Sequence, residues 1–165
     1  MKQICKINIT NPLVIESMKS MTIYKHEFCI STDKTKFDVD SIYEFLSQEA
    51  YWCHSIPREK VETSIQNSLC FGVFENEKQV GFARVVSDFS TIAYLGDVYI
   101  LKADRGRGLA KWLLETIMNY PDLQGLRRWI LLTADAHELY RQFGWSDIAE
   151  PHKWMELHNK NVYKK

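Results

Sequence analysis

The sequence lacks an excess of either charge and any long apolar run, and each absence excludes a class of protein. Lysine and arginine total 21, aspartate and glutamate also total 21, and the formal net charge is zero. A protein that binds nucleic acid mainly by neutralising phosphates is normally basic, so we expect no nucleic-acid partner. No apolar run approaches the roughly 18 residues that a membrane-spanning helix requires, so we also expect no membrane segment.

Closely spaced cysteine pairs are missing as well. Cys5, Cys29, Cys53 and Cys70 include no pair at C-x-x-C spacing, so neither a zinc ribbon nor a thioredoxin-type centre is indicated. The histidines near the C-terminus show no metal-ligand spacing, and we predict no metal. The first 20 residues do not form a secretory signal, because a proline interrupts their apolar part. We therefore expect free thiols and a cytoplasmic location.

The 165 residues and the hydrophobic content of 45% are typical of one globular domain. We interpret residues 1–20 as an N-terminal extension or extra strand, 21–157 as the domain, and 158–165 as a polar tail. Alternating or apolar runs predict strands over residues 22–31, 69–74, 79–86 and 93–101. Helical spacing predicts helices over residues 41–47, 58–67 and 111–118, the first of them capped by Asp40. Residues 128–132 predict a buried parallel strand, the capping-box pattern of 135–138 predicts another helix, and 145–148 and 153–157 predict closing strands.

The most informative stretch is a glycine-rich turn, residues 105–110, between an apolar strand and an amphipathic helix. The first N–H groups of a helix have no partner within it, and the helix dipole makes them attractive to anions. Gly106 and Gly108 can adopt positive φ, which lets backbone close around phosphate oxygens, and the two arginines add charged donors. The turn is neither a P-loop nor G-x-G-x-x-G, so it predicts a phosphate site of another kind.

Two motifs indicate which family of proteins this chain resembles. The turn has the pattern R-x-x-G-x-A, and Tyr140-Arg141-Gln142-Phe143-Gly144-Trp145 follows later in the chain. With the order of elements, they resemble the GCN5-related N-acetyltransferase (GNAT) superfamily over about residues 21–157. The resemblance implies a mixed α/β fold with a central mixed sheet of about six to seven strands and about four flanking helices.

The resemblance also implies an activity. It implies acetyl-CoA as the cofactor and transfer of its acetyl group to a primary amine, on a small molecule or a peptide, by direct attack in a ternary complex. A protein N-terminus, a lysine, a polyamine, an aminoglycoside, an amino acid and an arylamine all remain open as acceptors, and both a monomer and a homodimer remain open. The alternatives are a non-catalytic acyl-CoA-binding domain of the same fold and an RNA-binding module that uses the Arg-Gly repeats.

Cofactor contacts are implied in the turn, in the strand before it and at the end of the next strand. These residues are Val98, Tyr99, Ile100, Arg105, Gly106, Arg107, Gly108, Leu109, Ala110 and Thr133. The amides of the turn would hold the pyrophosphate, and the strand would pair with the pantetheine arm as it would with a peptide. Thr133 stands where the family often has asparagine, which puts one side-chain contact in doubt. Gly96-Asp97 would form a bulge in that strand.

Two residues are candidates for proton transfer. In the motif, Tyr140 is implied as the general acid, because a phenol of pKa about 10 keeps its proton at neutral pH. Asp97 is the leading candidate for the base, and the alternative is that it holds the bulge by bonding backbone amides.

The amine acceptor would lie among aromatic residues. The candidates for its pocket are Tyr51, Trp52, His54, Phe89 and Tyr94. Aromatic walls suit a desolvated amine or its alkyl portion. The alternatives are that the aromatic residues belong to the core and that His54 is a solvated loop residue.

Overall fold

One six-stranded sheet, in the order β1-β2-β3-β4-β5-β6, forms the centre of the computed structural model, which describes residues 20–163. Strands β1 (Thr22–Lys25), β2 (Phe28–Ser31), β3 (Leu69–Glu75), β4 (Lys78–Ser87) and β5 (Ile92–Ile100) pair antiparallel in turn. Strand β6 (Arg128–Ile130) pairs parallel to β5. The predicted mixed sheet is confirmed.

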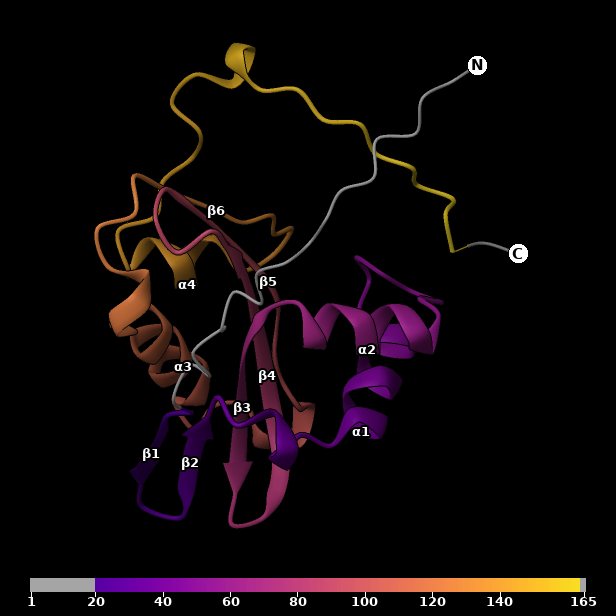
Figure 1. Cartoon of the computed structure of the whole chain (residues 1–165), viewed down its shortest axis with the longest axis vertical. Helices are drawn as coiled ribbons and strands as arrows, with labels where there is room; N and C mark the ends of the chain where they lie inside the picture. The colour runs from indigo at the N-terminus through magenta and orange to yellow at the C-terminus, as the bar shows by residue number, and fades with distance from the viewer. Residues whose placement is uncertain (1–19, 164–165) are drawn as a thin grey trace, which may run out of the picture.

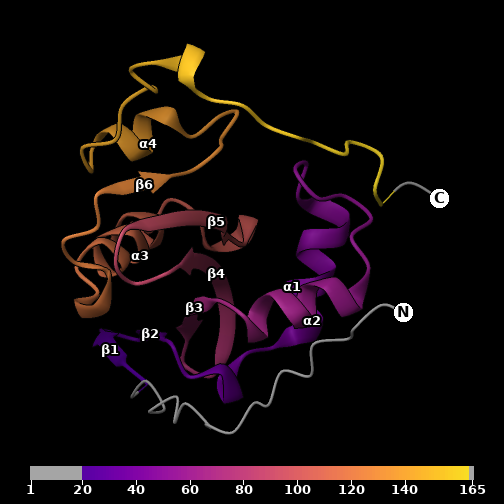
Figure 2. The same cartoon turned by 45° about the horizontal axis from the view of Figure 1, so that its top comes forward.

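Helices cover both faces of the sheet (Figures 1 and 2). Helices α1 (Val39–Glu44) and α2 (Arg58–Gln66) lie on one face, and α3 (Leu109–Met118) and α4 (His137–Arg141) lie on the other. Each pair closes a separate apolar cluster. Leu113 and Ile117 of α3 are fully buried against the sheet on one side, and Ile42 and Val61 are fully buried on the other. The core therefore has two layers, with the sheet between them.

Helix α1 ends in an unusually wide turn. Asp38 caps α1 by accepting a hydrogen bond from the Ser41 amide at 3.0 Å, so the predicted cap at Asp40 is wrong by two residues. After α1 the chain forms a π-helical turn, Phe45–Glu49, in which the Ala50 amide donates to the Phe45 carbonyl at 3.0 Å. Such turns are rare and often lie at functional sites.

Several predicted elements differ from the structure. Residues 22–31 form two strands, because His26 adopts a φ of 54° and reverses the chain between β1 and β2. The capping box at residues 135–138 is also wrong, because α4 has no side-chain cap at Ala136; instead the Ala136 amide donates to the Thr133 hydroxyl at 3.1 Å.

The predicted closing strands are wrong. Residues 145–148 form no strand, and Pro151–Lys153 form a single 3₁₀ turn before an extended, exposed segment. Proline lacks the N–H that a strand ladder uses, which opposes pairing at this point. Strand β6 is consequently shorter than predicted and half-buried rather than buried, because within residues 20–163 no strand pairs with its outer edge. The predicted extension falls almost wholly on residues 1–19, which lie outside the described range, as do residues 164–165.

Between Ser20 and Tyr163, none of the helices is both long and apolar enough to cross a membrane. Cys29, Cys53 and Cys70 carry free thiols, and Cys5 lies outside the described residues.

Candidate active site

The glycine-rich turn presents open backbone amides at the start of α3. Gly106 and Gly108 have φ values of 78° and 76°, and a Cβ added to either would meet no atom within 4 Å. None of the hydrogen bonds between described residues uses the backbone N–H of Gly106, Gly108, Leu109 or Ala110. The partial positive charge of the helix N-terminus lies at the same place. The turn therefore offers convergent donors to an anion.

The two arginine side chains of the turn are engaged elsewhere. Arg105 Nε donates to the carbonyl oxygen at the end of β5 at 3.0 Å. Arg107 pairs with three carboxylates, those of Glu75 at 2.8 Å, Glu27 at 3.2 Å and Asp104 at 3.3 Å. The hydrogen bond to Glu75 and the neighbouring negative charges raise the pKa of Arg107. The donors of this turn are thus mainly backbone amides rather than the guanidinium groups.

An unpaired strand edge leads from this turn toward α4. Strand β5 pairs with β4 as far as Ile100, but it pairs with β6 only over Ile92, Ala93 and Tyr94. From residue 95 to residue 100, the edge of β5 that faces away from β4 therefore has no partner strand in the described chain. Val98, Tyr99 and Ile100 all lie on this stretch. The Tyr99 ring is buried and stacks on Phe45 at 3.7 Å between centroids, so only its backbone faces the edge.

The predicted bulge is present in the same stretch. Arg84 of β4 pairs with Gly96, whereas Phe82, two residues earlier in β4, pairs with Tyr99, three residues later in β5. Asp97 has a φ of 54°, in the left-handed region. The extra residue breaks the regular ladder where the β5 edge becomes free.

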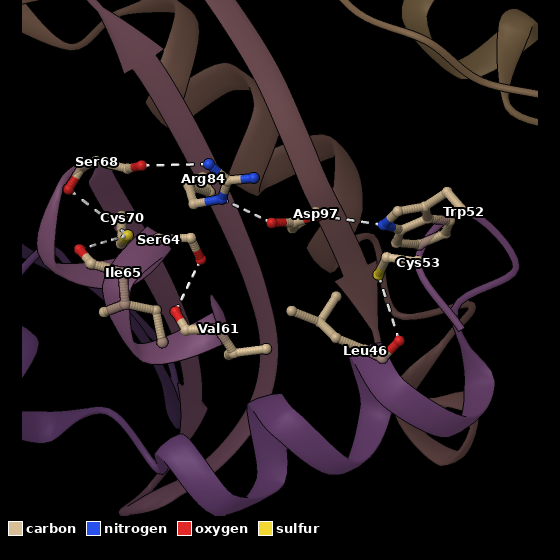
Figure 3. A network of polar contacts seen from close by, with 10 residues as sticks. All are labelled: Leu46, Trp52, Cys53, Val61, Ser64, Ile65, Ser68, Cys70, Arg84 and Asp97. Carbon is tan, nitrogen blue, oxygen red and sulfur yellow. Dashed lines mark hydrogen bonds and ion pairs between the residues drawn. The ribbon is translucent and has the colours of Figure 1, made fainter. Parts of the chain in front are cut away.

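Asp97 links the bulge to two other elements through side chains (Figure 3). Its Oδ2 accepts a hydrogen bond from Arg84 Nε at 2.6 Å, and its Oδ1 accepts one from Trp52 Nε1 at 3.1 Å. Arg84 also donates to the Ser68 hydroxyl at 3.3 Å. The Asp97 side chain is only 11% exposed. Both of its oxygens are therefore occupied, by side chains rather than by the backbone amides of the alternative interpretation.

Tyr140 lies buried on α4, the helix that follows β6 in the chain. It is 8% exposed, and its ring meets Trp145 at 6.0 Å between centroids. Burial raises the pKa of Tyr140 to about 12, and Tyr51, Asp135 and Tyr94 act in the same direction. At neutral pH, Tyr140 holds its proton.

The loop after the π-helical turn closes the site on the side of α1. The Tyr51 hydroxyl accepts a hydrogen bond from the Ala134 amide at 2.9 Å, and the Trp52 ring meets that of Tyr51 edge-on at 5.0 Å. Both rings remain partly exposed, at 57% and 42%. Because Trp52 also bonds Asp97, this loop contacts β5 and the segment after β6 at once.

Gly96 explains the position of Tyr94. A Cβ at Gly96 would lie 2.9 Å from the Tyr94 ring, so only glycine lets that ring lie across β5. Burial, and then the charge of Asp97, raise the pKa of Tyr94. Tyr94 therefore lies on β5 close to Asp97, the residue to which Trp52 donates its hydrogen bond.

Two other candidates lie apart from this group. His54 is exposed, and its Nδ1 bonds only the neighbouring Ser55 hydroxyl at 2.9 Å. Phe89 lines a separate cavity of about 620 Å³ with Leu69 and Tyr120. Thr133 points its hydroxyl at Ala136, as described above. Arg84 and Ala134 were not predicted from the sequence to be part of this site, because no motif indicates that Arg84 bonds Asp97 or that Ala134 bonds Tyr51.

A mixed sheet that opens between β5 and β6, beside a helix whose first amides are free, defines an acetyltransferase fold. Residues 39–145 match the family model described as the Acetyltransferase (GNAT) family, and this chain belongs to that family. The predicted family is confirmed.

Similar proteins agree with this assignment. A Gibberella zeae protein named as an acetyltransferase is 32% identical in an alignment of 167 positions, gaps included, that covers 87% of this chain and 89% of that protein. A crystal structure of a protein from Xanthomonas campestris pv. campestris, assigned to the GNAT family, is 45% identical, with a TM-score of 0.82 over 84% of this chain and 97% of that chain. A Deinococcus radiodurans structure shares the fold at 15% identity, with a TM-score of 0.64 over 84% of this chain and 94% of that one.

Proposed function

We propose that this protein transfers the acetyl group of acetyl-CoA to a primary amine. The observation that carries the proposal is the free edge of β5 over residues 95–100. This edge begins near the open amides of the turn before α3 and ends where β6 pairs with β5 at Tyr94, and Tyr140 lies on α4, the next helix after β6. A long ligand with an anionic group at one end and a reactive group at the other fits such a track.

The residues present fit acetyl-CoA in two respects. The amides of Gly106, Gly108, Leu109 and Ala110 would hold its pyrophosphate, and the space above the two glycines is open. The free N–H and C=O groups of β5 would bond its pantetheine amides, as an edge strand bonds a peptide. When bound, acetyl-CoA supplies an acetyl thioester.

Tyr140 is the residue that we assign to proton donation. Transfer forms a C–N bond and breaks a C–S bond, so the departing sulfur requires a proton. Burial keeps the Tyr140 phenol protonated throughout the physiological pH range, and its raised pKa of about 12 lies above that of a free phenol. A neutral phenol can give its proton to the sulfur as the C–S bond breaks, so that no free thiolate has to form.

We assign Asp97 to positioning rather than to the removal of the amine proton. Its two oxygens already accept hydrogen bonds from Arg84 and Trp52, so a proton from the amine would displace an existing donor. The ion pair orients Trp52 beside Tyr51 at the mouth of the site. The excess proton of the amine would then leave through water.

The acceptor side suits an amine on an apolar carrier. The Tyr51, Trp52 and Tyr94 rings provide aromatic faces for alkyl groups or a cationic nitrogen. We also propose a cytoplasmic location, which the free thiols of Cys29, Cys53 and Cys70 support.

Replacement of the proposed acid tests this function. In Tyr140→Phe, we expect acetyl-CoA-dependent thiol release with an active amine to fall more than roughly tenfold, because one proton donor contributes 10²–10⁴ to such rates. The affinity for CoA, measured by calorimetry, should not change.

Tyr120→Phe is a matched control, because Tyr120 is equally buried but packs against Phe71 away from the site. Unchanged turnover in Tyr140→Phe would contradict the assigned acid. CoA binding without turnover on any amine of a broad panel would instead favour a non-catalytic acyl-CoA-binding domain.

A further inference from the structure

Helices α1 and α2 cover only part of their face of the sheet. Successive side chains of a strand alternate between the two faces. Val85 of β4 lies opposite Leu95 of β5, and both belong to the core cluster on the α3 side. Val86 lies opposite Tyr94, so these two side chains lie on the face of α1 and α2. Phe82, four residues before Val86, is fully buried on that face, whereas Val86 is 44% exposed.

Three apolar side chains lie together on this uncovered part, and we call them the apolar stripe. They are Val86 of β4 and Ile92 and Tyr94 of β5, and they belong to neither core cluster. Ile92 is 39% exposed and Tyr94 is half-buried. Ile92 lies on the same face as Tyr94, two residues away, and diagonally across from Val86. Core packing therefore does not account for these neighbours.

The apolar stripe adjoins the proposed site. The Tyr94 ring lies over Gly96, and the next residue, Asp97, accepts the hydrogen bond from Trp52. The outer edge of β5 becomes free directly after Tyr94, where the pairing with β6 ends. The stripe thus starts where the free edge starts and leads away from it toward the turn between β4 and β5. An amine at the start of the free edge can lay its carrier on the stripe.

The charged groups at both ends of the stripe are already engaged. Arg84, two residues before Val86 on β4, pairs with Asp97 at 2.6 Å. Asp88, in the turn beyond the stripe, accepts four hydrogen bonds from the residues that follow it. A second ammonium group on the stripe would therefore lose hydration without gaining a free carboxylate. A hydrocarbon chain would instead gain free energy by leaving water.

The stripe is too small for a protein partner. A stable protein interface takes about 800 Å² from each partner. Even an aromatic side chain buries no more than about 250 Å², and the three side chains of the stripe are already partly buried. The exposed area therefore suits the hydrocarbon part of a small amine rather than a second copy of the chain or another protein.

We propose that the acceptor is a primary amine on an uncharged hydrocarbon carrier, and that Val86 and Ile92 determine how long that carrier can be. The nitrogen would lie at the start of the free edge, and the carrier would pass over Tyr94 and end beside Ile92. The two residues from Tyr94 to Ile92 span about 7 Å. Contact would therefore end at about the length of a hexyl chain. This inference rests on the proposed acetyl transfer and specifies its acceptor.

A series of straight-chain primary amines, from ethylamine to octylamine, tests the stripe. We expect kcat/KM for acetyl-CoA-dependent thiol release to rise about two- to fourfold with each methylene, as for a CH₂ group that leaves water, and to level off beyond hexylamine. Cadaverine matches hexylamine in length but carries an ammonium group in place of the last methyl. Its kcat/KM should be at least roughly tenfold lower than that of hexylamine, because this charge would lose its hydration.

A double substitution locates the effect. Val86→Thr with Ile92→Thr keeps β-branched side chains, which strands favour, but places hydroxyl groups on the stripe. We expect the rise with each methylene to fall below about 1.5-fold. Tyr24→Thr is the control, because Tyr24 is 76% exposed on β1 at the other edge of the sheet, and it should keep the full dependence on chain length. Circular dichroism checks that both variants are folded.

The outcomes separate this inference from the proposed function. Acetylation that does not depend on chain length, equal rates for cadaverine and hexylamine, or an unchanged dependence in the double variant would each overturn the inference and leave acetyl transfer standing. If no amine is acetylated, the proposed function fails, and calorimetry of ethylamine and hexylamine with the CoA-bound protein decides. Tighter binding of hexylamine that is lost in the double variant would support the stripe as a hydrocarbon site, and equal binding of the two amines would overturn it.

Discussion

The two sides of the proposed site are held in place by different means. On the cofactor side, left-handed glycines and the start of α3 place the amides of residues 106–110, and Arg107 ties the turn to Glu75 and Glu27. On the acceptor side, Tyr51 and Trp52 are placed by hydrogen bonds to Ala134 and Asp97, which lie far from them in the chain. The first arrangement is set mainly by local backbone conformation, and the second is set by contacts between distant segments. We therefore expect substitutions on the cofactor side to abolish CoA binding and those on the acceptor side to change the affinity for the amine only moderately.

The largest effect should come from Gly108→Asp. Asp at a φ of 76° is strained, and its carboxylate would occupy the open space beside the free amides and repel an anionic ligand. We expect loss of measurable CoA binding by calorimetry. Gly125→Asp is the control, because Gly125 has a φ of 73° and equally open surroundings in another turn. Equal CoA affinity in the two variants would refute the assignment of the phosphate site.

A smaller effect should come from Trp52→Phe, which keeps an aromatic ring but removes the hydrogen bond to Asp97. We expect the KM for the amine to rise about three- to tenfold, in line with the net free energy of about 1 kcal/mol for a typical hydrogen bond. The KM for acetyl-CoA should stay constant in the same steady-state measurements. Trp112→Phe on α3 provides the control. A rise in the KM for acetyl-CoA alone would show that Trp52 serves the cofactor side.

Arg107→Gln should affect the cofactor side less than its place in the motif suggests. Because its guanidinium pairs with Glu75, Glu27 and Asp104, we expect CoA affinity to change less than about threefold. Thermal unfolding should shift slightly downward at low salt and less at high salt. A large loss of CoA affinity in calorimetry would mean that the guanidinium turns to the phosphate when the ligand binds.

The smallest effect concerns stability at high pH. Burial raises the pKa of Cys53, Cys70 and Tyr140 to about 12, above the values of 9 and 10 for the free groups. The folded state therefore binds these protons more tightly than the unfolded state, and the free energy of unfolding should fall as the pH rises from about 9 toward 12. Denaturant unfolding from pH 7 to 10.5 measures this slope. In Cys70→Ala, the free energy of unfolding should fall less steeply with pH. An unchanged slope in that variant would show that Cys70 does not contribute to the pH dependence.

The difference between the two sides of the site also explains which structural features could be predicted from the sequence. The turn at residues 105–110, the helix after it and the β3–β4 hairpin depend on neighbours in the chain, and all were predicted near their observed positions. The bulge at Gly96-Asp97 was signalled by a glycine inside a strand.

The rest depended on contacts between distant segments. No local pattern pairs Trp52 with Asp97 or Tyr51 with Ala134, and no motif marks Arg84 as the partner of Asp97. The predicted closing strands show the converse error. Residues 153–157 have the composition of a strand, but they pair with no strand of the described chain, although Trp154 lies 5.1 Å from the guanidinium of Arg128 on β6.

Gly96 links two positions in the divergence of this protein. A Cβ there would lie 2.9 Å from the Tyr94 ring, so a larger residue at position 96 would force that ring to shift or require a smaller residue at position 94. Loss of the Tyr94 ring would in turn remove one aromatic wall from the acceptor side. Relatives that accept a bulkier amine are therefore expected to change both positions together, and this pair is a natural starting point for altering acceptor choice without touching the turn before α3.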